Sequence, residues 1–289
     1  MKVVLFCGGA GMRLRGYSED VPKPMVTIGS RPVLWHVMKY YAHFGHNDFI
    51  LCLGYKANAI KTFFLEYQES VSNDFVFSQG GRKLDFVQRD IDDWKITFVD
   101  TGLRSTIADR LRLAEPYLGG DEMFLANYSD GLTDFHLPVM IEEFTRSDAY
   151  ASFLGVQPRS SSLDTVQMDA DGTVRGIQSM TDANIWINGG YFVLRRDVFR
   201  YIQPGDELVY QPFRRMIAEG KVRSHRYNGF WQCMDTFRDK QILDELQSSD
   251  AAPWCLWKNG RSAAESLREL TPVSERNGPV LHRSSAVSV

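Results

Sequence analysis

Residues 2–14 read KVVLFCGGAGMRL, an apolar run that passes directly into a glycine-rich loop. Gly8, Gly9 and Gly11 lack the Cβ atoms that would keep the backbone away from an anion, so successive N–H groups can point at phosphate oxygens. Arg13 adds a positive charge to the same loop. The stretch predicts a buried strand followed by a polyphosphate-binding turn. An ordinary strand-to-helix turn of an α/β protein is the alternative interpretation.

A second cation follows in VPKPM, residues 21–25. Pro22 and Pro24 fix their own φ angles and bias the residue before each of them toward an extended conformation, which presents Lys23 on a stiff segment. A dinucleotide-binding oxidoreductase is disfavoured, because the loop lacks the third glycine of that fingerprint. The apolar run at 48–54 also does not end on an acidic residue that could bind a ribose hydroxyl.

The composition indicates a globular protein with a large core. The chain has 289 residues, 44% of them hydrophobic, and its formal net charge of −3 argues against nucleic acid as a partner. Four separated cysteines match neither a zinc site nor a disulfide framework, and Cys7 and Cys52 are predicted core residues. The chain shows neither a signal-peptide pattern nor 18 consecutive apolar residues. We therefore expect a cytoplasmic protein without a membrane partner.

Apolar runs alternate with stretches of helical period, which is typical of a mostly parallel sheet with helices on both faces. The predicted strands are 3–7, 49–53, 96–100, 123–128, 151–156 and 190–194, and the predicted helices are 32–44, 57–67 and 137–146. The polar segments 74–93 and 157–185 are predicted to be small β hairpins or insertions over the face of the sheet. Residues 1–260 are expected to form a single domain, and residues 261–289 a poorly ordered tail.

Two aspartates are candidates for a metal site. Asp130 ends an apolar run and precedes a glycine. Ligands of open α/β sheets collect at the carboxyl ends of strands, so Asp130 is placed to face the same crevice as the glycine loop. Asp130 and Asp235 together could hold Mg²⁺. Water molecules and phosphate oxygens of the nucleotide would complete the coordination shell of the metal. Taken singly, either aspartate is more often a helix cap or a turn residue.

The chain resembles the sugar-1-phosphate nucleotidyltransferases over nearly all of residues 1–258, and within them it is similar to the glucose-1-phosphate cytidylyltransferases. The glycine loop with Arg13 and Lys23 marks the broad family. Two of the later motifs, VDTG and GFWQCMDT, indicate the cytidylyl branch. The motifs that carry the resemblance are GGAGMRL at 8–14, PKPMV at 22–26, IGSRPVLWH at 28–36, VDTG at 99–102, INGGYF at 187–192, GFWQCMDT at 229–236 and APW at 252–254.

The resemblance implies a Rossmann-like nucleotide-diphospho-sugar transferase fold and a homo-oligomer. It also implies Mg²⁺-dependent transfer from CTP to glucose 1-phosphate, giving CDP-glucose and pyrophosphate. A phosphate monoester with a second pKa of about 6 is already largely ionised near neutral pH, so no general base is required. Catalysis then reduces to in-line alignment of two anions and neutralisation of charge on the α-phosphate and pyrophosphate.

Site roles follow from this chemistry together with the resemblance. Arg13 and Lys23 are expected to be catalytic, and Asp130 and Asp235 to bind the metal. The expected nucleotide-binding residues are Gly8, Gly9, Gly11, Met12, Arg13 and Arg110, and the expected sugar-phosphate-binding residues are Tyr128, Asn188, Gly189 and Trp231. An exposed helix arginine at Arg110 and a structural turn at Asn188 are alternatives that need no function.

Several positions depart from the family pattern. Met12 replaces a loop threonine, Ala108-Asp109 replaces a glycine pair, and Gln211 stands where a glutamate is common. The segment 179–181, Ser-Met-Thr, replaces a Glu-Lys-Pro whose lysine meets the sugar phosphate, so Arg175, Arg159 or another basic residue would have to take over that contact. These departures leave three alternatives: another phosphorylated acceptor, UTP or dTTP in place of CTP, and a non-catalytic nucleotide-sugar-binding regulatory protein. Retention of both cations and both aspartates favours an enzyme.

Overall fold

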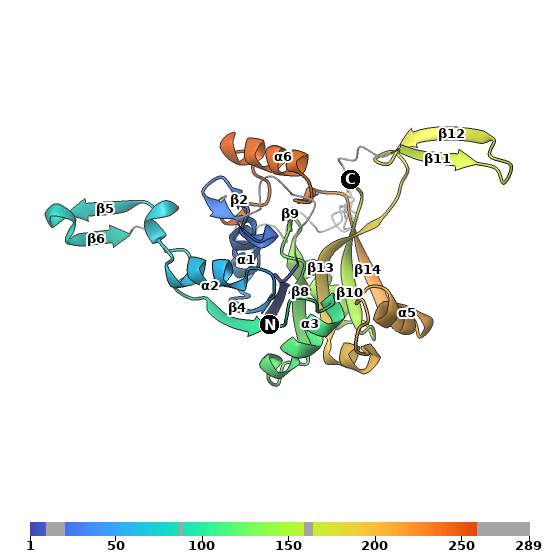
Figure 1. Cartoon of the computed structure of the whole chain (residues 1–289), viewed down its shortest axis with the longest axis horizontal. Helices are drawn as coiled ribbons and strands as arrows, with labels where there is room; N and C mark the ends of the chain where they lie inside the picture. Colours follow the sequence, from blue (N-terminus) through green and yellow to red (C-terminus); the bar gives the residue numbers. More distant parts are fainter. Residues whose placement is uncertain (10–20, 87–88, 159–163, 259–289) are drawn as a thin grey trace, which may run out of the picture.

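A computed structural model of the chain describes residues 1–9, 21–86, 89–158 and 164–258 (Figure 1). Its centre is a seven-stranded sheet. The strand order is β14 (Val222–Tyr227), β10 (Ala151–Val156), β13 (Ile187–Arg195), β8 (Met123–Asn127), β1 (Val3–Phe6), β4 (Asp48–Leu53) and β7 (Lys95–Asp100). β13 runs antiparallel to both neighbours, and the other neighbouring pairs are parallel. The expected mixed, mostly parallel sheet is confirmed.

The central strand β1 is apolar at every position because both of its faces are buried. Val3 and Leu5 point into one core layer, and Val4 and Phe6 point into another. The first layer includes residues of α1 (Val33–His43), α2 (Ala57–Leu65), α4 (Leu137–Thr145) and α6 (Phe237–Ser248), and the second includes residues of α3 (Ile107–Ala114) and α5 (Gln211–Ala218). Helices therefore cover both faces, as expected. Cys7 and Cys52 are fully buried, free cysteines, which confirms their core role.

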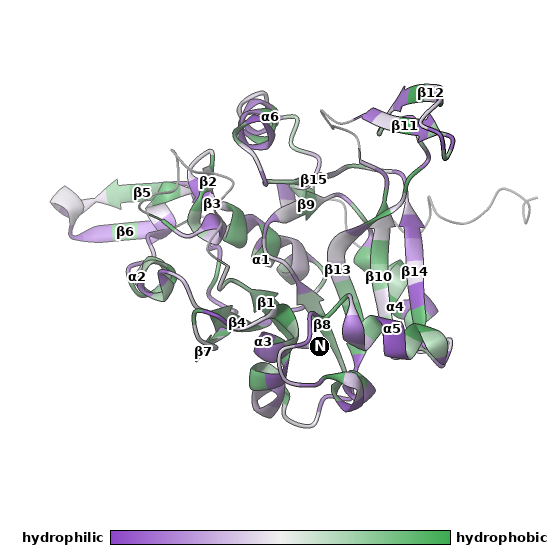
Figure 2. Ribbon diagram, turned by 45° about the vertical axis from the view of Figure 1, so that its right-hand side comes forward, coloured by the Kyte–Doolittle hydropathy of each residue, from purple (hydrophilic) through white to green (hydrophobic). Residues whose placement is uncertain are grey.

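Every strand and helix predicted from the sequence is present, with ends shifted by a few residues. The sequence analysis missed β14, α3, α5 and α6. Strand β14 escaped because it is an edge strand that is polar at most positions, which Figure 2 shows in purple. Helix α6 is rich in charged residues, so its apolar periodicity is weak. Helices α3 and α5 are amphipathic, but each has only eight residues, which is too short a window for a periodic pattern to stand out.

Two hairpins project from the body of the molecule (Figure 1). One pairs β5 (Phe75–Ser78) with β6 (Lys83–Phe86), and the other pairs β11 (Asp164–Met168) with β12 (Val174–Ser179). The predicted β hairpins are thereby confirmed, but their expected place over the face of the sheet is wrong, because both project outward (Figure 1). Residues 261–289, predicted to be a tail, lie outside the described residues. In the part of the chain that is described, no helix is both long enough and apolar enough to cross a membrane.

Candidate active site

The candidate site lies where the chain order of the sheet reverses. Strand β1 is flanked by β4 on one side and β8 on the other, which is the switch point at which open α/β sheets bind ligands. Gly8 and Gly9 follow β1, and Asp130 follows β8. Because β13 runs the other way, its first residues, including Asn188, reach the same edge. Gly11, Met12 and Arg13 lie outside the described residues.

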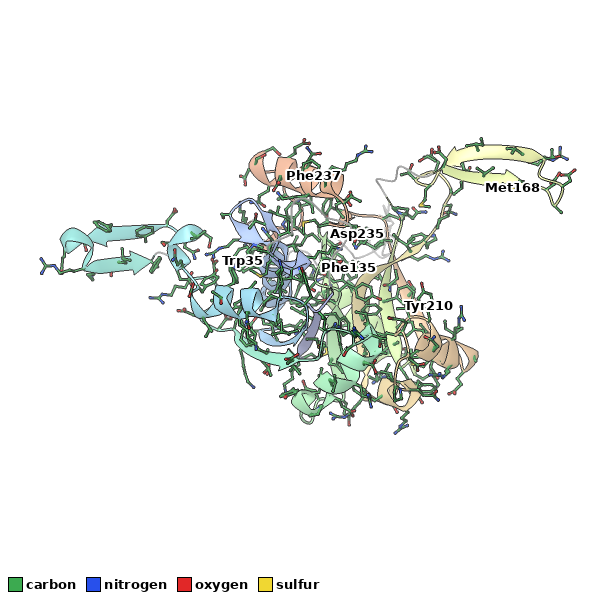
Figure 3. All side chains as sticks on the ribbon, viewed as in Figure 1. Trp35, Phe135, Met168, Tyr210, Asp235 and Phe237 are labelled. Carbon is green, nitrogen blue, oxygen red and sulfur yellow. The ribbon has the colours of Figure 1, made fainter. Side chains whose placement is uncertain are left out.

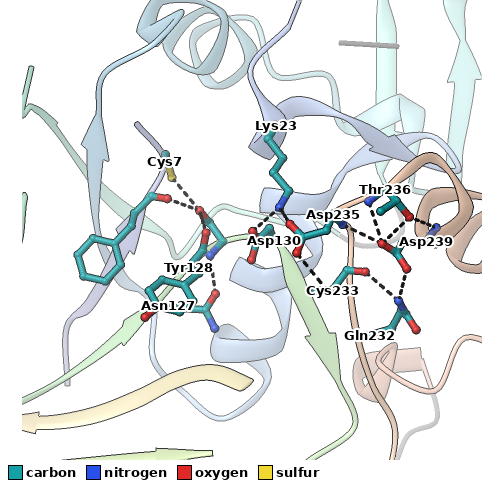
Figure 4. Close-up of polar contacts among 12 residues, drawn as sticks. Cys7, Lys23, Asn127, Tyr128, Asp130, Gln232, Cys233, Asp235, Thr236 and Asp239 are labelled. Carbon is teal, nitrogen blue, oxygen red and sulfur yellow. Dashed lines mark hydrogen bonds and ion pairs between the residues drawn. The ribbon is translucent and has the colours of Figure 1, made fainter. Parts of the chain in front are cut away.

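One ammonium group joins the two aspartates (Figure 4). Lys23 Nζ lies 2.6 Å from Oδ2 of Asp130 and also contacts Oδ1 of Asp235. The three side chains are 15%, 25% and 35% exposed, in the order Lys23, Asp130, Asp235. They come from three segments far apart in the sequence. The structure therefore brings together three residues that the sequence analysis had singled out separately.

The backbone around Lys23 differs from the expectation. Lys23 opens a short 3₁₀ helix, η2 (Lys23–Met25), instead of an extended segment. Proline is compatible with the first turn of a helix, because the N–H it lacks would have no partner there. Pro24 and Met25 are buried, and the N–H of Val26 donates to the carbonyl of Lys23 at 3.1 Å. The segment is anchored, as the stiff presentation of Lys23 requires.

A strained turn holds Asp130. Ser129 has a φ of 62°, which is uncommon for a residue other than glycine. Two hydrogen bonds from Ser129 stabilise this turn. The N–H of Ser129 donates to Asn127 Oδ1 at 2.7 Å, and its hydroxyl donates to the carbonyl of Phe6 at 2.8 Å. The second bond ties the end of β8 to the end of β1. No sequence signal singled out Ser129.

A small hairpin brings Asp235 to the same place. Strand β15 (Trp231–Cys233) pairs with β9 (Gly131–Thr133), which directly follows Asp130. The N–H of Met234 donates to the carbonyl of Asp130 at 2.8 Å. Immediately after Asp235, a capping box between Thr236 and Asp239 starts α6. Asp235 is therefore fixed between a hairpin and a capped helix.

The electrostatics of this cluster favour a further cation. Burial raises the pKa of Asp130, and although Lys23 opposes this shift, the nearby charge of Asp235 adds to it, so the net shift is upward. Burial lowers the pKa of Lys23, but attraction to both carboxylates outweighs that effect and raises it. Two carboxylates share one ammonium, which leaves the cluster with an excess negative charge.

The donor set fits a hard divalent cation. Carboxylate oxygens are the ligands that Mg²⁺ prefers, usually one or two of them, with water and substrate phosphates filling the other positions. Asp130 and Asp235 supply two such groups in a partly exposed crevice. Within the described ranges, no cluster of three histidine, cysteine, aspartate or glutamate side chains could hold a metal by itself. The arrangement therefore fits a metal that arrives with a phosphate-bearing substrate.

Arg110 lies next to Gly8, the residue that opens the glycine loop, and is only 3% exposed. The alternative of an exposed helix arginine is therefore wrong. Its guanidinium donates to the carbonyl of Gly8 at 3.1 Å, the carbonyl of Leu53 at 3.1 Å and the hydroxyl of Thr101 at 2.6 Å. These acceptors lie at the carboxyl ends of β1, β4 and β7. Arg110 thus joins three parallel strands below the loop, and a direct contact with nucleotide stays a prediction.

The absence of a side chain at Gly8 and Gly54 serves this guanidinium. A Cβ on Gly8 would lie 1.9 Å from Arg110 Nη1, and a Cβ on Gly54 would lie 2.8 Å from the carbonyls of Gly8 and Gly102. Real Cβ atoms do not approach so closely. Gly8 therefore makes room for a buried cation, a role that the phosphate interpretation of the loop did not foresee.

We expect Gly54→Ala to lower the free energy of unfolding by about 2 kcal/mol, because the added methyl group overpacks three strand ends. The melting temperature should fall by roughly 5 °C. Gly120→Ala is the matched control, since a Cβ there would meet no atom within 4 Å. Calorimetric melting of both variants checks this expectation. Equal melting temperatures would contradict the close packing of Gly54 against the carbonyls of Gly8 and Gly102.

The expected sugar-phosphate residues form a connected wall. Asn188 Nδ2 donates to the Tyr128 hydroxyl at 3.2 Å, and Trp231 Nε1 donates to the carbonyl of Gly189 at 2.9 Å. Asn188 Oδ1 also accepts the N–H of Gly190 at 2.9 Å, in a turn where Gly190 has a φ of 80°. The turn role of Asn188 is thus present. Its contact with a sugar stays a prediction.

The β11–β12 hairpin lies away from the catalytic cluster. Asp235 lies over the centre of the molecule, whereas Met168 lies far out on this hairpin (Figure 3). Arg175, on the same hairpin, pairs with Asp169 at 2.7 Å. Arg226, by contrast, lies on β14 with its guanidinium 5.4 Å from the centre of the Trp186 ring. Sequence reasoning did not select Arg226, because β14 itself was missed.

Comparisons with known proteins agree with this geometry. A family model described as nucleotidyl transferase matches residues 2–235. The chain belongs to the nucleotidyl transferase family. The resemblance inferred from its motifs is confirmed. The expectation that the protein is an enzyme that transfers nucleotidyl groups is also confirmed. Enzymes of this family generally use a divalent metal.

Two curated relatives of this nucleotidyltransferase are named glucose-1-phosphate cytidylyltransferase. The Salmonella typhimurium protein is 35% identical over 263 residues, and the Salmonella typhi protein is 36% identical over 263 residues. Each comparison covers 89% of this chain and 100% of the relative.

Solved structures share the fold. A Bacillus anthracis protein in complex with a sucrose matches with a TM-score of 0.63 at 18% identity, covering 85% of this chain and 94% of that chain. HddC from Yersinia pseudotuberculosis, complexed with GMP-PN, matches with a TM-score of 0.60 at 19% identity, covering 84% and 98%. The expected nucleotide-diphospho-sugar transferase fold is confirmed.

Proposed function

We propose that the enzyme joins α-D-glucose 1-phosphate to CTP, forming CDP-glucose and releasing pyrophosphate. The names of the two Salmonella relatives support this choice of substrates. The observation that carries the proposal is the ammonium of Lys23, held between two carboxylates from distant segments at the switch point of the sheet. Such a cluster suits phosphoryl chemistry, in which positioning and charge neutralisation supply most of the catalysis.

In this proposal each group has one task. The loop residues Gly8 and Gly9, together with Gly11, Met12 and Arg13, receive the base and the outer phosphates. Asp130 and Asp235 hold Mg²⁺, which when bound supplies positive charge to the nucleotide phosphates. Lys23 donates to an oxygen of the α-phosphate and stabilises the negative charge that gathers there during the in-line attack. The acceptor phosphate attacks as it stands, because it is already ionised.

The acceptor side uses the wall of Tyr128, Asn188, Gly189 and Trp231. Trp231 packs against the hydrophobic core and donates its ring N–H to Gly189, so the wall is rigid before substrate binds. A rigid wall favours alignment, because little conformational entropy is lost when the sugar binds. We assign Asn188 to the sugar hydroxyls, with its Tyr128 contact holding the amide in place.

We also propose a cytoplasmic homo-oligomer. Phe75, Val76 and Phe77 on β5 are exposed, although side chains of this kind are usually buried. A lone two-stranded hairpin is marginally stable in water. Contact between copies would cover these side chains, and sedimentation of the purified protein tests whether it assembles.

The first test is pyrophosphate release with glucose 1-phosphate and Mg²⁺, using CTP, UTP, dTTP, ATP and GTP in turn. Release with CTP and a product of CDP-hexose mass is the expected result. Release with another triphosphate would reassign the base. Nucleotide binding without turnover on any sugar 1-phosphate would support the non-catalytic regulatory alternative.

We expect Asp235→Asn to raise the Mg²⁺ concentration needed for half-maximal turnover by at least about 100-fold, because the loss of a direct ligand weakens metal binding. Turnover as a function of Mg²⁺ concentration measures this effect. Asp169→Asn is the matched control, since Asp169 pairs with an exposed arginine on the outer hairpin. An unchanged Mg²⁺ dependence in Asp235→Asn would exclude Asp235 as a ligand.

A cationic side chain, that of Arg226 on β14, lies two strands away from Asn188 of the acceptor wall. Asn188 is in register with Gly155, and Gly155 is in register with Arg226. Two strand spacings place the Cα atoms of Asn188 and Arg226 about 10 Å apart. We expect Arg226→Gln to raise the KM for glucose 1-phosphate by about tenfold, as for a lost charged hydrogen bond, and to leave the KM for CTP unchanged.

Arg223→Gln is the control for this prediction, because Arg223 points to the opposite face of the same strand. Steady-state kinetics with each substrate varied in turn supply the comparison. Equal acceptor KM values for wild type and Arg226→Gln would place Arg226 outside the acceptor site.

A further inference from the structure

A second cavity of about 690 Å³ lies apart from the cluster of Lys23, Asp130 and Asp235. Its walls come from the turn between β2 (Thr27–Ile28) and β3 (Arg31–Pro32), the first turns of α1, the end of the short helix η3 (Glu69–Val71), residues 89–90, the end of α6 and the helix η7 (Leu256–Lys258). No residue assigned to nucleotide, sugar or metal lines it. The volume is within the range of about 300–1,000 Å³ that is common for small-molecule sites.

The lining of this cavity is positively charged. Arg31, Lys39, Arg89 and Lys258 contribute four cations, whereas Asp90 and Asp250 contribute two carboxylates. Lys258 pairs with Asp250 at 3.2 Å, and Arg89 pairs with Asp92, outside the lining, at 3.6 Å, so the excess charge is one positive unit. His36 also lines the cavity, and burial lowers its pKa to about 4, so it adds no charge at neutral pH. A chain with a net charge of −3 therefore concentrates positive charge here.

The charge is concentrated in the buried part of the cavity. Asp90 Oδ2 lies 3.8 Å from Arg31 Nη2, and Asp90 Oδ1 lies 3.3 Å from Lys39 Nζ. The side chains of Arg31, Lys39 and Asp90 are 4%, 15% and 8% exposed. One carboxylate faces two cations, so this group keeps an excess positive charge where water provides little screening. An anion in the cavity would offset it.

The position of Lys39 is set by aromatic rings as well as by Asp90. Its ammonium lies 5.6 Å from the centre of the Trp35 ring and 6.0 Å from that of Trp257. Both tryptophans line the cavity. These cation–π contacts hold the charge at the cavity wall. Ser30 and Asn73 add polar side chains that can donate hydrogen bonds to oxygen atoms of a ligand, whereas the hydroxyl of Ser72 donates to Asp90.

Two short elements connect this cavity to the active site. From Lys23 the chain passes through the β2 (Thr27–Ile28) and β3 (Arg31–Pro32) hairpin to Arg31 in the cavity wall. From Asp235 it passes along α6 to Gln247, which also lines the cavity. The two elements touch, because the N–H of Gly29 donates to Asp244 Oδ1 at 3.2 Å.

We propose that this cavity is an effector site for a small, multiply charged phosphate anion. Binding of the anion between Lys39, Arg89 and Lys258 draws η7 and the end of α6 toward the β2–β3 turn. Because that turn and α6 carry Lys23 and Asp235 at their other ends, the anion changes the spacing of the catalytic cluster and with it the turnover number.

Binding is tested by calorimetry of the full chain with inorganic pyrophosphate in the absence of metal. The double variant Arg89→Gln/Lys258→Gln should weaken one binding event at least tenfold. Both side chains are about half exposed, so this variant should keep its fold. Lys95→Gln, which replaces an exposed lysine that does not line the cavity, should bind as wild type does. Lys23→Met should retain the event that the double variant loses.

Two results would overturn the site. One is unchanged pyrophosphate binding in the double variant, and the other is loss of all binding in Lys23→Met, which would assign every event to the catalytic crevice. These binding results stand whether or not the chain turns over CTP. A failure of the proposed transferase function is therefore distinguishable from a failure of the effector site.

Transmission is tested by turnover at saturating substrates with increasing orthophosphate. We expect orthophosphate to change kcat at least twofold in the wild type and to leave the double variant unaffected. Asp244→Ala, which removes the acceptor for Gly29, should bind pyrophosphate normally but lose the response of kcat. A response of KM alone would indicate simple competition in the active site and would contradict an effector role.

Discussion

Replacing Lys23 with methionine should lower kcat by roughly 1,000-fold, as expected when a preorganised charge next to a developing anion is lost. Methionine keeps the length and apolar stem of the side chain but removes the ammonium. The KM for CTP should change much less, because the missing contact is strongest in the transition state. Turnover and KM from initial rates with CTP and glucose 1-phosphate test both parts of this prediction.

The control for Lys23→Met is Lys95→Met. Lys95 also pairs with an aspartate, Asp48, at 3.3 Å. It lies at the amino end of β7, however, whereas the catalytic cluster lies at the carboxyl ends of the parallel strands. Its replacement should leave kcat near the wild-type value. If Lys23→Met kept kcat within a factor of ten of wild type, Lys23 would serve only to pair the two aspartates.

Replacing Arg110 with methionine should lower the free energy of unfolding by about 4 kcal/mol, because three acceptors at the strand ends lose a charged donor. The melting temperature should fall by about 10 °C. The carbonyl of Gly8 is one of these acceptors, so the start of the glycine loop should also shift. We therefore expect kcat/KM for CTP to fall by about 100-fold, equivalent to about 2.7 kcal/mol.

Arg112→Gln separates this effect from a general change in α3. Arg112 lies on the same helix, is half exposed and pairs only loosely with Asp109 at 3.7 Å. Its replacement should change the free energy of unfolding by less than about 0.5 kcal/mol. Arg110→Lys should behave like Arg110→Met, because a single ammonium cannot reach three acceptors. Wild-type stability in Arg110→Met would contradict the role of Arg110 in joining the ends of the three strands.

Much of the fold could be predicted because the central strands are buried on both faces. Runs such as 3–7 and 49–53 are apolar throughout, and this pattern has few explanations other than an interior parallel strand. Strand β14 was missed for the opposite reason, since it lies at the edge of the sheet and most of its residues are polar. Helix α6 was missed because charged residues dominate it, and its placement depends on the capping box at Thr236.

The candidate site was predictable in its residue types but only partly in its contacts. Lys23, Asp130 and Asp235 were selected from glycine, proline and strand patterns, and the structure places them in mutual contact. The sequence analysis did not select Ser129, because its role depends on a left-handed backbone and on an acceptor from another strand, the carbonyl of Phe6. Arg110 was assigned to nucleotide, whereas the structure shows it bonded to strand ends.

The amino-acid sequence by itself determined the class of fold, the family and the chemical nature of the site. These follow from local patterns: apolar runs, glycines after a strand, and a lysine between prolines. Only the tertiary structure decided that one ammonium joins two aspartates 105 residues apart in the chain, that Gly8 makes room for a buried guanidinium, and that a cationic cavity adjoins α6. Such contacts depend on how strands and helices pack, and residues distant in sequence carry no local signal of it.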